Sequence, residues 1–390
     1  NANKLGTGGG GGTIIGHYAG YHAQGTQMVH VGQSAGKYAS GSYNVFVGLS
    51  AGQGGTTSAP YSTGINNVAV GAYALDAFTT GGSNTTVGYQ SLSGVTTGGY
   101  NTALGFQAGA ALTDGATNVA IGYLPLAIGT GNNYVVAIGS LAGYNSTADW
   151  NVYIGASAGR ETRAGVSQVY IGPSAGYYAT GSYNTFMGAN AGKGGTTSAP
   201  YSSGTENTAL GYNALTGFTT AYYCVAIGNK AGDSITTGDR NTIVGHDAGS
   251  SLTSGRLNTV LGTDAMNTMT IGERNVAIGN DALTAGVEDS YNVAIGYEAL
   301  HDQNAGGSDG TSTATNNTMV GYQAGDTITT GKQNTGFGSG VAFDIDANNQ
   351  TAIGYGATTD SANDIAIGNT SVDEVKGQVD FTTFSDKRIK

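Results

Sequence analysis

Residues 317–325 read Asn-Thr-Met-Val-Gly-Tyr-Gln-Ala-Gly, and this nine-residue phrase decides the fold. In outline the phrase is Asn, Val or Thr, a variable residue, an aliphatic residue, Gly, two variable residues, Ala, and then Gly or Leu. About 21 copies lie between Ile15 and Ile367, and the commonest step between copies is 17 residues. A fixed period of this kind predicts a solenoid, in which each copy forms one coil.

The residues inside each copy predict strands rather than helices. Each copy opens with a short β-branched run such as Val276-Ala277-Ile278, and a Gly closes the run where the chain must bend. A helical repeat would need about ten or more periodic residues per helix, and the glycines are too closely spaced for that. The sequence therefore predicts an all-β fold, a parallel β-solenoid or β-roll of about 21 short coils.

Stacking the coils turns each constant position of the repeat into a row along the solenoid. Alternation places the second and fourth positions on one face of the strand and the third on the other. We expect the aliphatic fourth position and the small alanine position to fill a narrow interior. The asparagines should stack their side-chain amides along the axis. With neighbouring strands about 4.8 Å apart, the coils predict a rod on the order of 100 Å long.

The chain divides into four segments. Residues 1–12 contain five consecutive glycines and are predicted to be a linker or cap. Residues 13–368 form the solenoid body. Residues 369–385 alternate apolar and polar side chains, as an extended strand segment does, and residues 386–390 follow them.

Inside the body, a longer segment is duplicated. Residues 36–75 and 176–215 match closely at an offset of 140 residues, and both contain Gly-Gly-Thr-Thr-Ser-Ala-Pro-Tyr-Ser. This phrase belongs to insertion loops at 53–66 and 193–206, and a third loop spans 301–316. Because these loops lengthen their repeats beyond the common 17-residue step, we expect them to leave the rod.

Composition excludes several classes of partner. Charged residues make up 10% of the chain, against about 25% in ordinary soluble domains. The net charge of −11 argues against nucleic acid or an anionic membrane surface as a partner. No apolar run approaches roughly 18 residues, so membrane insertion is not expected. The single cysteine, Cys224, stands where most copies carry Asn, which predicts a small buried substitute for Asn.

The charged residues do not predict an enzyme, and neither a cofactor nor a metal is expected. A glycosidase would need two carboxylates about 5–10 Å apart in a cleft. Asp247, Asp264 and Asp281 recur at 17-residue steps and should stack as an acidic stripe. We interpret the stripe as a solvated edge, with a bound cation as the alternative, because like charges this close favour a counterion. The five histidines show no metal-ligand spacing.

Aromatic side chains are the candidate binding residues. Tyr123 and Tyr322 directly follow the Gly of their repeats, so they should either stack as a structural ladder or stack on sugar rings. Tyr61 and Tyr201 lie in the two matching insertion loops, and Trp150 is the single tryptophan.

The repeat, as in Asn275-Val276-Ala277-Ile278-Gly279, resembles the head repeat of trimeric autotransporter adhesins. Similar repeats occur in phage tail-fibre proteins. The resemblance implies a left-handed parallel β-roll, with three chains wound side by side as a homotrimer.

The last residues, Ser385-Asp386-Lys387-Arg388-Ile389-Lys390, resemble the junction that opens the endosialidase-type intramolecular chaperone domain of phage tail spikes and fibres. In that family the chaperone assembles the trimer and then cuts itself off between a Ser and an Asp. The resemblance implies autocleavage between Ser385 and Asp386 in a precursor that carries the domain, with Ser385 as the nucleophile. Residues 386–390 would then be the start of that domain.

These observations together predict a structural and attachment fibre, located in a virion tail or otherwise outside the cell. The expected partners are further copies of the chain in a homotrimer, other tail proteins of the virion, and a glycan or protein on the host surface. The insertion loops are the expected receptor contacts.

Three alternatives stay open. A bacterial trimeric adhesin or extracellular filament would use the same repeat and differ by a membrane anchor or secretion signal. A polysaccharide-degrading spike would need a carboxylate cluster in a groove. An ice-binding protein would need a flat Thr array, and Thr pairs such as Thr79-Thr80 do recur, although they precede Gly in expected turns.

Overall fold

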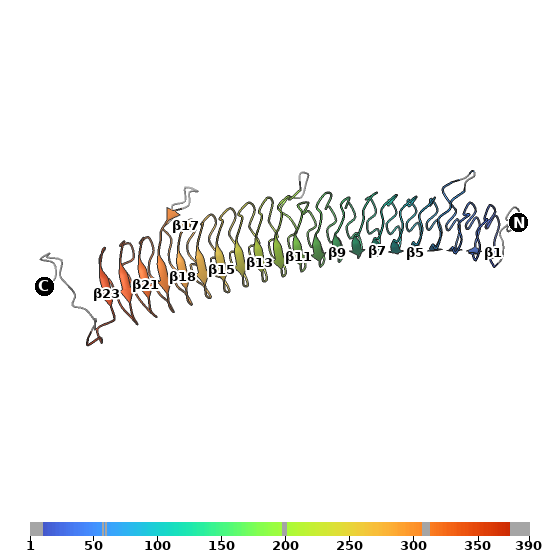
Figure 1. Cartoon of the computed structure of the whole chain (residues 1–390). Helices are drawn as coiled ribbons and strands as arrows, with labels where there is room; N and C mark the ends of the chain where they lie inside the picture. Colours follow the sequence, from blue (N-terminus) through green and yellow to red (C-terminus); the bar gives the residue numbers. More distant parts are fainter. Residues whose placement is uncertain (1–10, 57, 59–60, 197–200, 306–312, 375–390) are drawn as a thin grey trace, which may run out of the picture.

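The computed structural model describes residues 11–56, 58, 61–196, 201–305 and 313–374. The regular secondary structure of these residues consists of β-strands, with no helix among them. The chain winds into a long, slender rod, and its first and last strands lie at opposite ends (Figure 1).

Nearly every coil contributes one three-residue strand at the same place. Twenty-one strands form one sheet that runs the length of the rod, and all of their pairings are parallel. The strands of this sheet are β1 (Thr13–Ile15), β2 (Val29–Val31), β3 (Val45–Val47), β4 (Val68–Val70), β5 (Thr85–Val87), β6 (Thr102–Leu104), β7 (Val119–Ile121), β8 (Val136–Ile138), β9 (Val152–Ile154), β10 (Val169–Ile171), β11 (Thr185–Met187), β12 (Thr208–Leu210), β13 (Val225–Ile227), β14 (Thr242–Val244), β15 (Thr259–Leu261), β16 (Val276–Ile278), β18 (Val293–Ile295), β20 (Thr318–Val320), β21 (Thr335–Phe337), β22 (Thr351–Ile353) and β23 (Ile365–Ile367).

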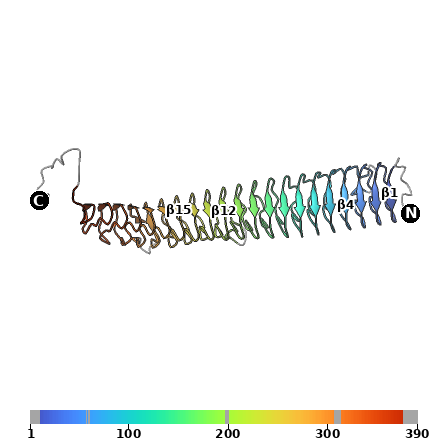
Figure 2. The ribbon, with the colours of Figure 1, turned by 90° about the horizontal axis from the view of Figure 1, so that it is seen from below.

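The register pairs identical positions of the repeat. In β16 and β18, for example, Ala277 lies opposite Ala294 and Ile278 lies opposite Ile295. Seen from below, the strands follow one another as parallel rungs along the rod (Figure 2). The predicted all-β parallel solenoid of about 20 coils is therefore confirmed.

A second, two-stranded pairing lies at the third insertion. The strands β17 (Asp289–Ser290) and β19 (Thr313–Ala314) pair in parallel, and Figure 1 shows β17 on the side of the rod opposite the main sheet. The first two insertions rejoin their coils by isolated parallel bridges, Ala39 with Ser62 and Ala179 with Ser202.

The third strand position forms the inward row, and in many coils its volume is matched by the residue six positions later. Ala69 is buried together with Leu75. Where the inward residue is an aromatic, as at Tyr153, the later position is a glycine, Gly159. A Cβ on Gly159 would lie 2.3 Å from the Tyr153 ring. Many coils therefore fill the interior with either Ala plus Leu or a large side chain plus Gly, as close packing requires. Coils with Ala plus Gly, such as Ala103 with Gly109, take a side chain from elsewhere in the coil, here Leu112.

The expectation that the aliphatic fourth position fills the interior is wrong. Together with the second position it forms the outward face, where Ile15 is 59% exposed and Leu104 is 49% exposed. The physical reason lies in the first position, where the Asn side chain must face inward to bond to the neighbouring coil. Because side chains alternate along a strand, the third position then also faces inward, and the second and fourth positions face outward.

The Asn row is a buried hydrogen-bonded ladder, as predicted. The main-chain amide of Asn258 donates to Oδ1 of Asn241 at 3.0 Å, and Nδ2 of Asn258 donates to the Gly272 carbonyl at 2.9 Å. The Asn258 Oδ1 in turn accepts the amide of Asn275 at 2.9 Å. Each side chain therefore satisfies backbone groups of two coils, which a buried backbone requires.

Left-handed residues turn the corners of each coil. The Gly after the strand has φ 139° at Gly279, where a Cβ would lie 2.2 Å from the carbonyl oxygen of Gly296. The chain also turns at non-glycine residues, because the residue two after this Gly and the residue before the Asn both take positive φ. Asp264 at 56° and Arg274 at 57° are examples. Such φ values are uncommon for non-glycine residues, and here the hydrogen bonds of the stacked coils hold them.

The predicted strand segment at 369–385 is described in part. The amide of Val372 donates to the Asn369 carbonyl at 3.1 Å, so the described residues 369–374 contain a turn. Residues 375–385 lie outside the described part of the chain, as do 1–10 of the predicted linker. Among the residues that the structure describes, no helix has the length and apolar character of a membrane span.

Candidate functional site

The largest candidate surface is the outward face, made by the second and fourth strand positions of the main sheet. Val or Thr occupies nearly all second positions, and aliphatic residues dominate the fourth. Exposed members recur along the whole rod, from Ile15 through Leu210 and Leu261 to Ile367. The exposed apolar members follow one another from coil to coil, so the face forms one continuous strip along the rod. Large contiguous apolar patches on protein surfaces commonly mark interaction sites, which makes this face a candidate for association.

Tyr61, predicted to contact a receptor from the first insertion loop, packs against the rod. Its ring stacks on His22, with centroids 4.5 Å apart and planes 23° apart, and lies 6.2 Å from the Tyr38 ring. The side chain is half-buried. Tyr61 therefore anchors the end of the insertion, and this aromatic cluster presents a surface of fixed shape beside it.

Tyr201 holds the matching place in the second insertion but has different neighbours. Its ring stacks on Tyr178, with centroids 5.6 Å and planes 25° apart. The guanidinium of Arg163 lies 5.5 Å from the Tyr201 ring centroid, within reach of a cation–π contact. Duplication has therefore preserved the anchor while changing the charge beside it.

Tyr123 and Tyr322 form the stacks expected of residues that follow the bend glycine. Tyr123 ends a run with Tyr89 and Phe106, in which successive ring centroids are 5.4 Å apart and planes differ by 16° and 14°. Tyr322 stacks on Tyr297 at 5.3 Å and 12°. Both stacks are exposed, so they can act as a structural ladder and also offer an aromatic surface to a ligand.

Trp150 lies directly before the Asn row and is 58% exposed. Its ring stacks on Tyr134, with centroids 4.1 Å apart and planes 9° apart. A hollow of about 760 Å³ lies beside Trp150 and also includes Asp149, Ser167 and Tyr183 in its lining. Of the five predicted binding residues, Trp150 is the one that lines this hollow.

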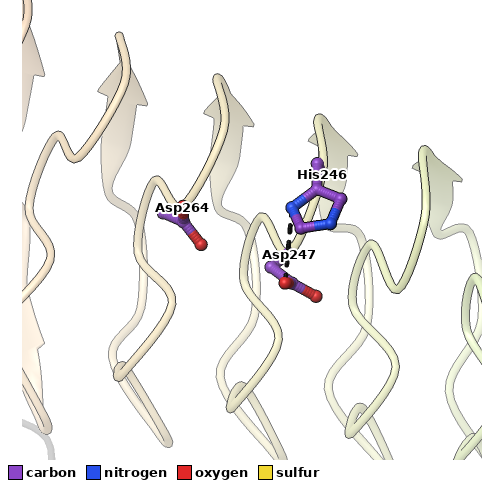
Figure 3. A group of neighbouring side chains, drawn as sticks. All are labelled: His246, Asp247 and Asp264. Atoms are coloured by element: carbon purple, nitrogen blue, oxygen red, sulfur yellow. Dashed lines mark ion pairs between the residues drawn. The ribbon is translucent and has the colours of Figure 1, made fainter.

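The predicted acidic stripe exists. His246, Asp247 and Asp264 come from adjacent coils (Figure 3), and their ligand atoms all lie within 4.8 Å of one another. Nδ1 of His246 is 3.3 Å from a carboxylate oxygen of Asp247. Burial, and then the charge of Asp264, raises the pKa of Asp281 in the following coil. The arrangement offers one imidazole and several carboxylates to a cation on an exposed edge.

The row of the stripe continues at Glu298, which the sequence reading missed although it occupies the same repeat position. Its carboxylate accepts a hydrogen bond from Nε2 of Gln323 at 2.6 Å, and this bond lowers the pKa of Glu298. Aligning the residue two after each bend glycine would have found it.

His30 is a second residue that the sequence reading did not single out. It occupies the inward row, is fully buried and stacks on Phe46 with ring centroids 5.1 Å apart. Among the described residues, neither ring nitrogen has a hydrogen-bond partner. Burial lowers the pKa of His30 to about 4, so the ring is neutral near pH 7.

Cys224 is the small buried substitute that the sequence predicts. Its amide donates to Oδ1 of Asn207 at 2.9 Å, and its Sγ is 3.3 Å from the Gly238 carbonyl. Burial raises the pKa of the thiol to about 11. A thiol with a raised pKa is a poor nucleophile, so Cys224 is structural.

The threonine pairs serve the backbone. The first hydroxyl of each pair donates to the next coil, as Thr79 Oγ1 does to the Thr96 carbonyl at 3.0 Å and Thr219 Oγ1 does to the Thr236 carbonyl at 2.9 Å. These hydroxyls are half-buried in a ladder. They are therefore a poor match to the flat, open Thr array of an ice-binding surface.

Two predicted features fall partly or wholly outside the described residues. Ser385 and Asp386, the autocleavage candidates, lie beyond residue 374. Of the loop at 301–316, residues 306–312 are not described, and the predicted loops at 53–66 and 193–206 also contain such residues.

Comparison with known proteins identifies no relative. No protein-family model matches the chain. No curated protein matches it either. The function is therefore argued from the residues and from the geometry of the solenoid.

Proposed function

We propose that this chain is the shaft of a homotrimeric attachment fibre of a bacteriophage tail. The observation that carries the proposal is the outward face, an apolar strip that follows about 20 coils without a partner in the described chain. Removing such a strip from water supplies a driving force for association of about 25 cal/mol per Å².

A second copy of the same chain is the partner that fits best. The strip repeats with the coil spacing, so a partner must present apolar side chains with the same period over the same length. A copy in parallel register does this automatically. Identical subunits around a threefold axis close the assembly and bury all three strips. The resemblance to autotransporter heads supports three chains with left-handed coils, and the resemblance at 385–390 supports a phage tail and maturation at Ser385.

Attachment is the role assigned to the insertions. The flanking residues of the first two insertions are held by Tyr61 and Tyr201 against the rod. A trimer would present each insertion three times, and three weak contacts to a host glycan or surface protein reinforce one another by avidity.

The assembly is tested by charging the outward face. Replacing Leu210, Leu261 and Phe337, which are all exposed in the single chain, with Lys should leave the coil intact. It should prevent association, because ammonium groups buried in an apolar interface are very costly. The measurement is the particle mass by light scattering.

The matched control is a triple lysine variant at exposed positions of the same or neighbouring coils, Thr220, Thr237 and Thr330. These side chains are exposed away from the strip, so the control should keep the wild-type mass. Equal masses for the two variants would refute the proposed interface.

Attachment is tested by trimming the first two insertions, replacing residues 55–61 and 195–201 with Gly-Ser linkers. We expect the labelled fibre to lose its adsorption to bacterial cells while its melting temperature stays within a few degrees. Unchanged adsorption would move the receptor contacts away from these loops.

A further inference from the structure

The residues that directly precede the Asn row form one exposed column, here called the pre-asparagine column. They all take left-handed backbone angles, such as 63° at Trp150 and 57° at Ser167. This conformation places their side chains at a corner of the coil. The aromatic members of the column are Tyr43, Tyr100, Tyr134, Trp150, Tyr183, Tyr223 and Tyr291, and all are exposed.

Trp150 has one covered face and one free face. The Tyr134 ring, from the preceding coil, lies nearly parallel to the indole at 4.1 Å, so aromatic planes in this column stack along the direction of the coils. The opposite face of Trp150 is directed toward the following coil. There the column holds Ser167, whose small side chain leaves the space open.

Tyr183, one coil beyond Ser167, also lines the hollow, and its ring is the second aromatic group available to a ligand there. Two coil steps separate Trp150 from Tyr183, a distance of about 10 Å at the usual strand spacing. Apolar contacts on both faces of a flat ligand need roughly 8 Å between walls, since each contact is about 4 Å. The gap therefore accepts one saturated six-membered ring between two aromatic side chains.

Polar groups at the same place suit the hydroxyls of a sugar. Ser167, Thr147 and Asp149 line the hollow together with the two aromatic residues. Oδ1 of Asp149 accepts the amide of Asn133 at 2.7 Å, which fixes the carboxylate and leaves acceptor capacity for a ligand hydroxyl. An apolar slot with a few oriented polar groups is the usual composition of a small-molecule site.

We infer that the hollow between Trp150 and Tyr183 binds one neutral hexopyranose residue of a glycan. The C–H faces of the sugar stack on the two aromatic side chains, while Ser167 and Asp149 bond its hydroxyls. Acidic sugars are disfavoured by the Asp149 carboxylate and by the net charge of −11. As a receptor site this inference rests on the proposed attachment function, whereas the sugar site itself is built within one chain.

Trp150 is the only tryptophan in the sequence, so its fluorescence reports on this hollow alone. The assembled full-length chain is titrated with maltotriose, cellotriose and N,N′,N″-triacetylchitotriose, and with glucuronic acid as the acidic comparison. We expect a saturable change in emission with at least one neutral trisaccharide and a response at least tenfold weaker to the acid. No response to any of the three neutral probes would overturn the inference.

A variant that fills the gap between Trp150 and Tyr183 tests the site most directly. Ser167→Tyr places an aromatic ring between Trp150 and Tyr183, and other tyrosines of the column already tolerate the same backbone angle, as Tyr183 does at 62°. The variant should abolish the sugar response. Ser83→Tyr is the matched control, because Ser83 lies in the same column beside a hollow with Tyr100 but without Trp150. A sugar response that survives in Ser167→Tyr would contradict the site.

The two proposals fail in different ways. A fibre that adsorbs to cells but whose Trp150 emission ignores the neutral sugars leaves attachment standing and refutes the sugar site. A chain that binds sugar through Trp150 but neither associates nor adsorbs refutes the fibre and leaves the site standing.

Discussion

The inward and outward faces of the main sheet differ in which residues they carry and in how those residues are packed. On the inward row the residue varies from Ala to Tyr, and in many coils a Leu or Gly six residues later matches its volume, as at Ala69 with Leu75 and at Tyr153 with Gly159. On the outward face the residues stay β-branched or apolar along the whole rod, although much of their surface is exposed.

We infer that the inward row is required for folding of one chain and that the outward face is required for assembly of several chains. Close packing inside one coil accounts for the inward row. Nothing in the described chain covers the outward face, so intrachain packing gives no reason for its apolar character. Substitutions on the two faces should therefore affect different measurements.

The largest effect is expected on the inward row. Tyr170→Ala removes a ring that is fully buried between Tyr153 and Phe186. Loss of a buried aromatic side chain should destabilise the coils around β10 by about 3–5 kcal/mol. Amide hydrogen exchange in the coils of β9 to β11 measures this locally, which suits a repeat protein that can open in parts.

The neighbouring outward residue is the control for this prediction. Ile171→Ala should change the stability within one chain by about 1 kcal/mol or less. Any further loss should depend on protein concentration, because it belongs to association. Equal, concentration-independent effects of the two substitutions would break the distinction between the faces.

The volume match within a coil predicts a rescue. Gly159→Leu alone should cost about 1–3 kcal/mol or more, because its Cβ would lie 2.3 Å from the Tyr153 ring. The double variant Tyr153→Ala/Gly159→Leu recreates the Ala plus Leu pair of other coils, in which Leu75 takes a φ of 52°. In urea denaturation the double variant should have a higher midpoint concentration than either single variant.

A double-mutant cycle quantifies the same match. The coupling between the two positions should favour the double variant by more than about 1 kcal/mol. Additive effects would mean that the inward volume is not shared within the coil.

The Asn ladder that borders the inward row should give an intermediate effect. Asn258→Ala leaves the amide of Asn275 and the carbonyl of Gly272 without their side-chain partners. Unpaired buried polar groups cost about 1–3 kcal/mol, and a lowered urea midpoint measures the loss.

Cys224 offers the reverse experiment, because its thiol interrupts the ladder. Cys224→Asn supplies an Oδ1 for the Asn241 amide and an Nδ2 for the Gly238 carbonyl, so it should stabilise the chain by about 1 kcal/mol. A destabilised variant would show that the interior here has adapted to the thiol.

The smallest effect concerns His30, a titratable group in an otherwise apolar row. Its folded pKa of about 4 lies below the ordinary value of 6.5, so the unfolded chain binds the proton more readily. Stability is complete above pH 6.5 and falls as the pH drops from 6.5 toward 4. At pH 5.5 the loss should be about 1 kcal/mol.

His30→Phe tests the cause, because Phe46 already occupies the same row in the next coil. In the wild-type chain, the coils of β2 and β3 should open more often at pH 5.5 than at pH 7, as measured by hydrogen exchange corrected for the intrinsic rate. In this variant the opening should be the same at both pH values. An unchanged difference between pH 7 and pH 5.5 would assign the titration to another group.

Much of the fold was predictable because residues with the same structural role recur at the same position of each repeat. The period gave the coils, the β-branched run gave the strands, and the recurring Asn gave the ladder. Hydrophobicity alone could not predict which face of the strand points into the coil, since Ala277 and Ile278 are both apolar. The direction of the faces follows from the Asn hydrogen bonds, which fix the inward side.

The candidate site was predictable only in part. Trp150 was singled out from the sequence as the lone tryptophan, but its partners were not. The order Trp150, Ser167, Tyr183 becomes visible when the residue before each Asn is aligned, because these residues are one coil apart in space and 16 or 17 apart in the sequence. The Trp150–Tyr134 stacking direction required the coordinates.

The mass of the native particle, measured together with the intact mass of the denatured chain, tests the central claim most directly. We expect a particle of three chains held by the outward face, with each chain of the matured fibre ending at Ser385. A particle with the mass of one chain would contradict it, because the outward face would then remain in water and the avidity argument would have no basis.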